Sequence, residues 1–98
     1  MLDTKSFAII GTGVVGTSIA IILEKAGLKC VGVNTRSQAS YERFCGYLPK
    51  EHLTLEQISR LADLIFITTQ DSAIEQVADK LSSYKSRKKD QIWVHCSG

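Results

Sequence analysis

The sequence predicts an α/β fold: a doubly wound parallel sheet of five strands in the order 3-2-1-4-5, forming a single domain. Three observations predict it. Short apolar runs without period-two alternation, typical of strands buried on both faces, alternate along the chain with segments of helical periodicity. A glycine-rich turn links the first apolar run to the first helical segment. Right-handed crossovers leave few strand orders, and the expected one places a ligand crevice at the C-terminal ends of strands 1 and 4.

The first half of the chain contains two strand–helix pairs. Residues 6–10 are the first expected strand, and residues 14–26 form a helix whose apolar side chains share one face. Residues 29–34 are the second strand. Ser37 then offers an N-cap oxygen to a helix that runs to about Cys45.

The second half is expected to add three more strands. A very short third strand around residues 51–53 follows the only proline of the chain. Thr54 and Gln57 have the spacing of a capping box, which opens a short helix. Residues 63–68 are the clearest buried strand, another helix with an apolar face follows, and residues 91–95 are the last strand.

Composition argues against several functional classes. The chain has 98 residues, a net charge of +2 and 44% hydrophobic residues, which fits one globular domain and gives no reason to expect nucleic-acid or membrane binding. The basic run at residues 85–89 is interpreted as a solvated loop. Cys30, Cys45 and Cys96 are widely spaced, so no metal site is expected, and reduced thiols indicate a cytoplasmic protein.

The glycine-rich turn predicts a dinucleotide pyrophosphate site. In the spacing Gly11-x-Gly13-x-x-Gly16, the first glycine permits the turn, the second admits the phosphate and the third lets helix and strand pack closely. The N–H groups of the first helical turn would face the pyrophosphate. A turn that needs glycine only for packing is the alternative. The residues expected to surround the pyrophosphate are Gly11, Thr12, Gly13, Val14, Val15 and Gly16.

The end of the second strand favours NADP over NAD. An NAD site usually has an acidic residue there, whereas this chain has the acid-free stretch Asn34-Thr35-Arg36-Ser37. The guanidinium of Arg36 would attract the 2′-phosphate of NADP, and Ser37 would offer its hydroxyl and backbone N–H. We expect Asn34, Arg36 and Ser37 to contact the cofactor. The alternative is that Arg36 is an ordinary surface arginine and Ser37 is only the N-cap of a helix.

Thr68, Thr69 and Gln70 are expected beside the nicotinamide ribose, because they lie at the end of the strand at residues 63–68. Hydrogen bonding within the loop and helix capping are an equally good interpretation of these three residues. No catalytic residue is assigned, because the cofactor itself supplies the hydride. His95 has no identifiable carboxylate neighbour and is interpreted as structural.

Four stretches together resemble the N-terminal half of a bacterial Rossmann-like oxidoreductase family. They are residues 11–16 (GTGVVG), 34–37 (NTRS), 62–74 (ADLIFITTQDSAI) and 95–98 (HCSG). The family is similar to pyrroline-5-carboxylate reductases and to F420-dependent NADP oxidoreductases, and one branch carries DUF2520, a domain of unknown function, after its Rossmann domain. The resemblance covers nearly the whole chain. It implies NADP binding and a reductase or dehydrogenase role on an unknown small-molecule substrate.

Members of that family continue into a helical second domain, which completes the active site and usually the dimer. We therefore expect residues 1–98 to be a dinucleotide-binding domain that lacks the C-terminal substrate and dimerisation domain, and that is not catalytic alone. Exposed apolar surface would favour self-association as a homodimer. A stand-alone nucleotide-binding or sensor module without catalysis is the alternative function.

Overall fold

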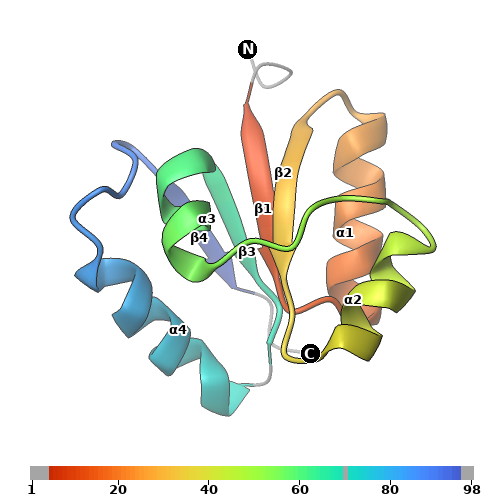
Figure 1. Cartoon of the computed structure of the whole chain (residues 1–98). Coiled ribbons are helices and arrows are strands. Elements are labelled where there is room, and N and C mark those ends of the chain that lie inside the picture. The colour runs from red at the N-terminus through yellow and green to blue at the C-terminus, as the bar shows by residue number, and fades with distance from the viewer. Residues whose placement is uncertain (1–4, 70, 96–98) are drawn as a thin grey trace.

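The computed structural model describes residues 5–69 and 71–95, which form a parallel sheet flanked by helices (Figure 1). The strands among these residues are β1 (Ser6–Ile10), β2 (Lys29–Asn34), β3 (Leu64–Ile67) and β4 (Ile92–His95). The helices are α1 (Val14–Lys25), α2 (Gln38–Cys45), α3 (Leu55–Leu61) and α4 (Asp71–Ser83). Neighbouring strands are parallel and follow the order β2-β1-β3-β4.

The predicted sheet of five strands in the order 3-2-1-4-5 is wrong, because the described sheet has four strands. The segment expected as the third strand makes a single isolated bridge, His52 to Val33 of β2. The Val33 N–H donates to Glu51 O at 3.0 Å, and the Leu53 N–H donates to Val33 O at 2.8 Å. Only a few residues separate the proline from the capping box, so the segment touches β2 without extending into a ladder.

Two apolar clusters sandwich the sheet. On one face, α1 and α2 bury Ala20 and Phe44 against Phe7, Ile9 and other side chains of β1 and β2. On the other face, α3 and α4 cover a second cluster, whose fully or almost fully buried members are Ala8, Ile10, Leu53, Ile58, Ala62, Ile65, Ile67 and Leu81. Both faces of β1 are therefore buried, as its continuous apolar sequence predicted.

Local capping explains where two helices begin. The Ser37 hydroxyl accepts a hydrogen bond from the Ser40 N–H at 3.1 Å, so α2 starts directly after it. At α3 both halves of the predicted capping box are confirmed, because Gln57 N–H donates to Thr54 Oγ1 and Thr54 N–H donates to Gln57 Oε1. Each pair satisfies backbone donors that the first helical turn leaves free.

The carboxyl ends of the strands gather at one edge of the sheet, at the bottom of Figure 1. The turn from β1 to α1 and the turn from β2 to α2 lie side by side there, joined by the Gly11 N–H, which donates to Asn34 O at 2.8 Å. The chain leaving β3 joins them, because the Thr68 N–H donates to Ile10 O at 2.9 Å. Segments that are far apart in the sequence therefore form one edge.

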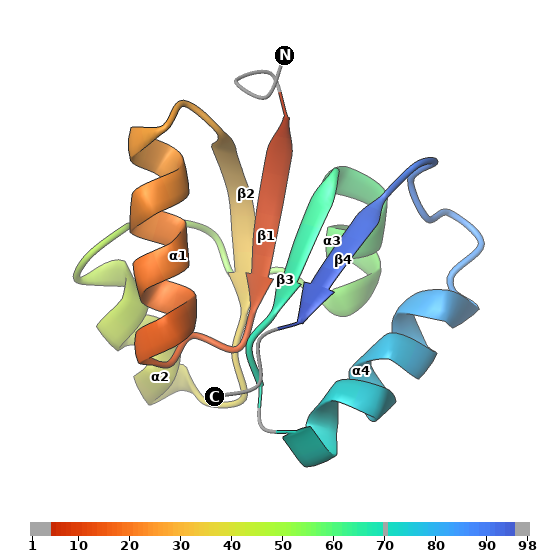
Figure 2. The same cartoon turned by 180° about the vertical axis from the view of Figure 1, so that it is seen from behind.

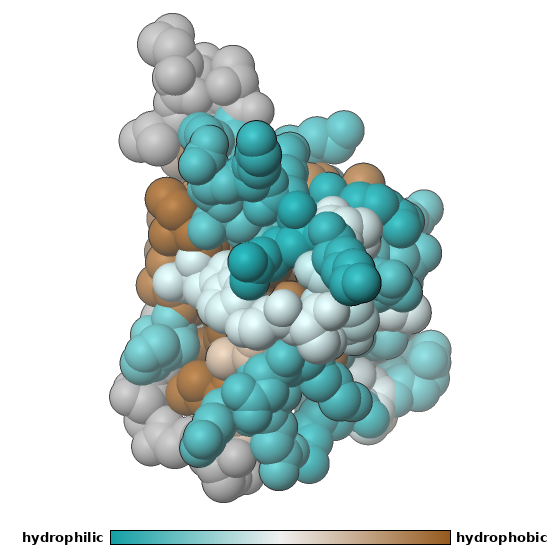
Figure 3. Space-filling model, turned by 90° about the vertical axis from the view of Figure 1, so that its left-hand side faces the viewer, coloured by the Kyte–Doolittle hydropathy of each residue, from teal (hydrophilic) through white to brown (hydrophobic). Residues whose placement is uncertain are grey.

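The face of β3 and β4 on the α1 side is covered by none of the described helices, and Figure 2 shows these strands in front with nothing over them. Leu64 and Phe66 of β3 face this side, and parallel pairing places Ile92 and Val94 of β4 beside them. In Figure 3, which faces the β4 edge, hydrophobic side chains gather along the left-hand margin. We call Leu64, Phe66, Ile92 and Val94 the open sheet face.

Candidate functional site

The carboxyl edge of the sheet carries two adjoining cavities. The first has a volume of about 190 Å³ and is lined by Gly11, Thr12, Gly13, Thr35, Arg36, Ser40, Thr68 and Thr69. The second has a volume of about 290 Å³ and is lined by Thr35, Arg36, Ser37, Gln38 and His52. Thr35 and Arg36 belong to both. The ends of β1, β2 and β3 thus converge on one site, with Arg36 where the two cavities meet.

The three glycines have different structural duties. Gly11 has a φ of +91°, which favours glycine, and an added Cβ would lie 3.0 Å from Thr69 Cγ2. At Gly16 an added Cβ would clash with the Gly11 carbonyl and lie 2.6 Å from Thr68 Oγ1. At Gly13 an added Cβ would meet nothing within 4 Å. Packing therefore requires the first and third glycines, whereas nothing in the fold requires the second.

Several polar groups at the first cavity are unused by the described residues. Gly13 is the N-cap of α1 and offers no side-chain cap, so the first N–H groups of this helix are open to a ligand. The buried Oγ1 of Thr69 has no hydrogen-bond partner among the described residues. The exposed guanidinium of Arg36 joins neither of the ion pairs found in that part of the chain. None of the described carboxylates lines either cavity.

Thr68 links the end of β3 to the glycine turn through hydrogen bonds. Its Oγ1 donates to the carbonyl oxygens of Gly11 and Ile10, the second at 3.3 Å. Its backbone N–H also binds Ile10 O. The hydroxyl is therefore engaged by the glycine turn, and the loop interpretation of this threonine agrees with its contacts.

The structure brings together only some of the residues expected at the cofactor. Gly11, Thr12, Gly13, Arg36, Ser37, Thr68 and Thr69 line one or both cavities. Gly16 lies beneath the turn, and Val14 and Val15 are exposed on the first turn of α1. Asn34 lines neither cavity, because its amide donates to Leu53 O at 2.7 Å. Gln70 lies outside the described residues.

Four lining residues were not among the expected ones: Thr35, Gln38, Ser40 and His52. Three of them flank the Arg36 and Ser37 pair in the sequence, so a wider window there would have included them. His52 gave no such signal. It reaches the site only because its segment forms the bridge to Val33 beside the end of β2.

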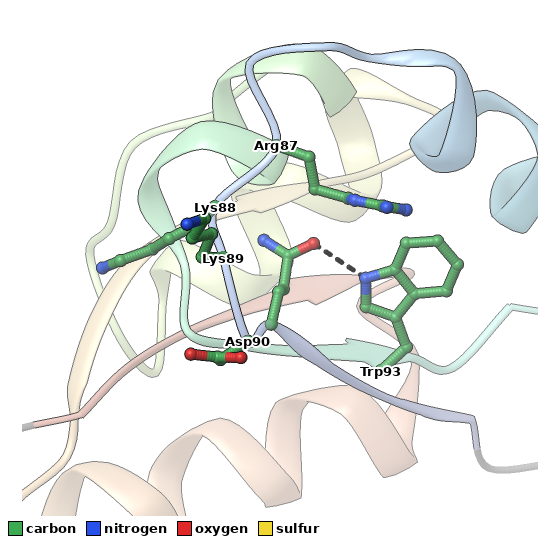
Figure 4. Close-up of a pocket in the computed structure, with 6 residues that line it drawn as sticks. Arg87, Lys88, Lys89, Asp90 and Trp93 are labelled. Carbon is green, nitrogen blue, oxygen red and sulfur yellow. Dashed lines mark hydrogen bonds between the residues drawn. The ribbon is translucent and has the colours of Figure 1, made fainter.

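A third cavity lies at the opposite edge of the sheet and has a volume of about 560 Å³ (Figure 4). The Arg87 guanidinium lies 5.5 Å from the centre of the Trp93 ring. Trp93 Nε1–H donates to Gln91 Oε1. The amide nitrogen of Gln91 in turn donates to Ser59 O and Ala62 O. These groups already satisfy one another, so this basic loop is held by structural contacts, unlike the site at the carboxyl edge.

Other classes of site gain no support from the described residues. No group of three metal-ligating side chains occurs among them. No helix in the described part is long and apolar enough to cross a membrane. Burial raises the pKa of the Cys30 thiol to about 11, which keeps it protonated and unreactive at neutral pH.

Solved structures of similar fold include three bacterial proteins. A "putative NADP oxidoreductase" from Bacteroides fragilis has a TM-score of 0.83 and 21% identity over 99% of this chain and 37% of its own. A semialdehyde dehydrogenase NAD-binding protein from Cupriavidus necator has a TM-score of 0.78 and 18% identity, over 94% of this chain and 33% of its own. A D-isomer specific 2-hydroxyacid dehydrogenase from Lactobacillus delbrueckii ssp. bulgaricus, complexed with NAD, has a TM-score of 0.71 and 19% identity, over 98% and 28%.

The chain therefore spans about a third of the length of these solved structures. No curated protein sequence matches it at a significant level. A family model matches residues 3–98, which is almost the whole chain. With the parallel sheet and the glycine turn at its carboxyl edge, this match shows that the chain belongs to the family of Rossmann-like domains.

Proposed function

We propose that this Rossmann-like domain binds NADP(H) at the carboxyl edge of its sheet and serves as the cofactor domain of an oxidoreductase. The names of the three similar structures support a nicotinamide dinucleotide, and that of the Bacteroides fragilis protein specifies NADP. The sequence resemblance to NADP-dependent reductases with a DUF2520 domain points the same way. Substrate, hydride transfer and homodimeric assembly belong to the proposal, because the chain spans only about a third of each solved relative.

The glycine turn suits the pyrophosphate. An N–H-rich helix start attracts anions, and α1 has no side chain of its own in that position. The empty space above Gly13 would let phosphate oxygens approach the backbone. The fold itself leaves Gly13 free to be any small residue, so its glycine is best explained by the ligand.

Arg36 suits the 2′-phosphate. It lies at the end of β2, lines both cavities and has no ion-pair partner among the described residues. A guanidinium can hold two phosphate oxygens, whereas an acidic residue at this position would repel them. The Ser37 hydroxyl already caps α2, so its contribution would come from its backbone N–H.

The first cavity would hold the remainder of the cofactor. Thr69 Oγ1 is buried there without a partner among the described residues, and it would bond a ribose or phosphate oxygen. The bound cofactor would supply the hydride chemistry. The residues of this chain would bind and orient it, and none is assigned to catalysis.

The observation that carries the proposal is Arg36, which has no ion-pair partner among the described residues and lies where two cavities meet, neither of them lined by a carboxylate of those residues. Calorimetric titration of the purified chain tests it. A charged hydrogen bond to phosphate predicts that NADPH binds roughly tenfold to a hundredfold tighter than NADH. Arg36→Ala should remove most of that preference while leaving NADH binding nearly unchanged. Lys89→Ala, which removes the same charge from the opposite edge, is the matched control.

Equal affinity of the unmodified chain for NADPH and NADH at low salt would contradict the NADP assignment. Absence of binding to both nucleotides would contradict the cofactor-domain function as a whole. An equal loss of preference in Lys89→Ala would mean that net charge, and not a contact of Arg36, selects the nucleotide.

A further inference from the structure

A histidine from outside the two nucleotide-facing turns shares a cavity with Arg36. His52 belongs to the segment between α2 and α3, and it lines the cavity of about 290 Å³ together with Thr35, Arg36, Ser37 and Gln38. This segment reaches the carboxyl edge because it forms the isolated bridge to β2. The residue is exposed, so a ligand in the cavity can reach its ring.

Two contacts fix the orientation of the His52 ring. Its Nε2 accepts a hydrogen bond from the Thr35 N–H at 3.2 Å. The ring also meets the Tyr41 ring edge to face, with centroids 5.4 Å apart and planes at 84°. Tyr41 is itself held, because its hydroxyl donates to Lys50 O at 2.5 Å. The imidazole is therefore positioned in advance of any ligand.

Two contacts with Thr35 bear on where the neutral ring carries its proton, because Nε2 lies 3.2 Å from the Thr35 N–H and 3.4 Å from Thr35 O. The N–H contact is the shorter, and a hydrogen on Nε2 would crowd the hydrogen that Thr35 directs at it, so these contacts favour the tautomer with its hydrogen on Nδ1. Nδ1 has no hydrogen-bond partner among the described residues. His52 thus brings an unused donor to a cavity in which Arg36 supplies the positive charge.

We infer that His52 is a second specificity-determining residue of the nucleotide site, which donates from Nδ1 to the 2′-phosphate that Arg36 holds. This inference rests on the proposed NADP(H) binding. The two residues approach the cavity from different segments, so a phosphate monoester between them would be bound from two sides. NADH, which lacks that phosphate, would gain nothing from His52.

Two substitutions at His52 separate its two nitrogens. His52→Asn keeps an amide N–H close to the position of Nδ1, and His52→Gln places its amide close to the position of Nε2. Titrations of NADPH and NADH, repeated with 2′,5′-ADP and ADP as smaller probes, measure the preference for the 2′-phosphate. We expect His52→Gln to weaken NADPH and 2′,5′-ADP roughly fivefold to tenfold, with NADH and ADP within about twofold. His52→Asn should retain most of the preference.

Arg36→Ala in the same series separates this inference from the proposed function. If the unmodified chain prefers NADPH and Arg36→Ala abolishes the preference while His52→Gln keeps it, the inference is wrong and the proposed function stands. An equal loss of NADPH and NADH in both His52 variants would assign the ring to the adenine or to loop structure, which also overturns it. If the unmodified chain shows no preference, both fail. Melting curves by circular dichroism establish that each variant is folded.

Discussion

At the scale of single residues, Gly13 separates a ligand-binding turn from a merely tight one. Its φ of −71° and ψ of −165° suit any residue, and an added Cβ would meet nothing within 4 Å. We therefore expect Gly13→Ala to leave the melting temperature nearly unchanged. Dinucleotide affinity should fall about tenfold or more, because the methyl group would occupy the space of the pyrophosphate. Titration with NADPH measures the loss.

Gly16→Ala is the contrasting variant. Its added Cβ would lie 2.6 Å from Thr68 Oγ1 and 3.0 Å from Ile9 Cγ2, so α1 would have to move away from β1. We expect a lower melting temperature there even without ligand. If Gly13→Ala lowered stability as Gly16→Ala does, or left the affinity unchanged, the turn would be structural only.

The residue scale also shows what local sequence could predict. The spacing of Gly11, Gly13 and Gly16 indicated the turn, because the left-handed φ of Gly11 and the approach of Gly16 to the Gly11 carbonyl are local, whereas the close contacts of Gly11 and Gly16 with Thr69 and Thr68 are not. The Asn34 amide was expected at the cofactor and instead binds Leu53 O. His52 was missed because its position also depends on a contact between distant segments. No local sequence pattern shows that residues 51–53 lie beside the end of β2. Local sequence patterns could not predict contacts between segments that are distant in the sequence.

At the scale of elements, Asp63 joins the start of the sheet to the basic loop. Its carboxylate accepts hydrogen bonds from Ser6 N–H at 3.0 Å and Ser6 Oγ at 3.2 Å, and it pairs with Lys88 Nζ at 2.9 Å. The Ser6 backbone N–H, followed by Lys88, holds the pKa of this carboxyl below its usual value. Asp63 therefore couples β1, β3 and the loop before β4.

The lowered pKa makes stability depend on pH. The unfolded chain binds a proton at Asp63 more readily than the folded chain, so the stabilisation is complete above the ordinary aspartate pKa of about 3.9. It is lost as the pH falls from there through the lower folded pKa. We expect the urea midpoint of Asp63→Asn to fall less than that of the unmodified chain between neutral pH and about pH 3.

Asp90→Asn is the matched control for that measurement. Asp90 is exposed in the same loop, and its φ of 59° suits asparagine. The urea midpoint of Asp90→Asn should change with pH as that of the unmodified chain does. Parallel pH curves for Asp63→Asn and the unmodified chain would contradict the role of Asp63.

The elements were largely predictable because their signals are local. The capping box of α3 and the N-cap of α2 each depend on residues within a few positions of one another, and both are confirmed. The strand expected around residues 51–53 is wrong for a physical reason. Apolar character favours burial, and Leu53 is indeed buried, but a strand also needs a ladder of hydrogen bonds. The ladder depends on the path of the chain after the proline, which composition does not encode.

At the scale of the whole molecule, the open sheet face leaves apolar surface in water. Sheets built from parallel strands are normally covered on both faces, yet β3 and β4 lack a helix on the α1 side among the described residues. Ile92 is 55% exposed there, on a strand that ends the sheet. The outer side of helix α1 adds Ile22, which is 63% exposed. Apolar surface of this kind promotes association, and an unpaired strand edge adds to that tendency.

We therefore expect the purified chain to associate as its concentration rises, in sedimentation equilibrium at several loading concentrations. Ile92→Lys should shift it toward the monomer, because a charge on the edge strand opposes both apolar contact and edge-to-edge pairing. Tyr47→Lys is the control, since Tyr47 is 71% exposed but follows α2, away from β4. A monomer at every concentration would mean that the open sheet face tolerates water. An equal shift in Tyr47→Lys would assign the association to overall charge instead of to this face, because both variants change the net charge by the same amount.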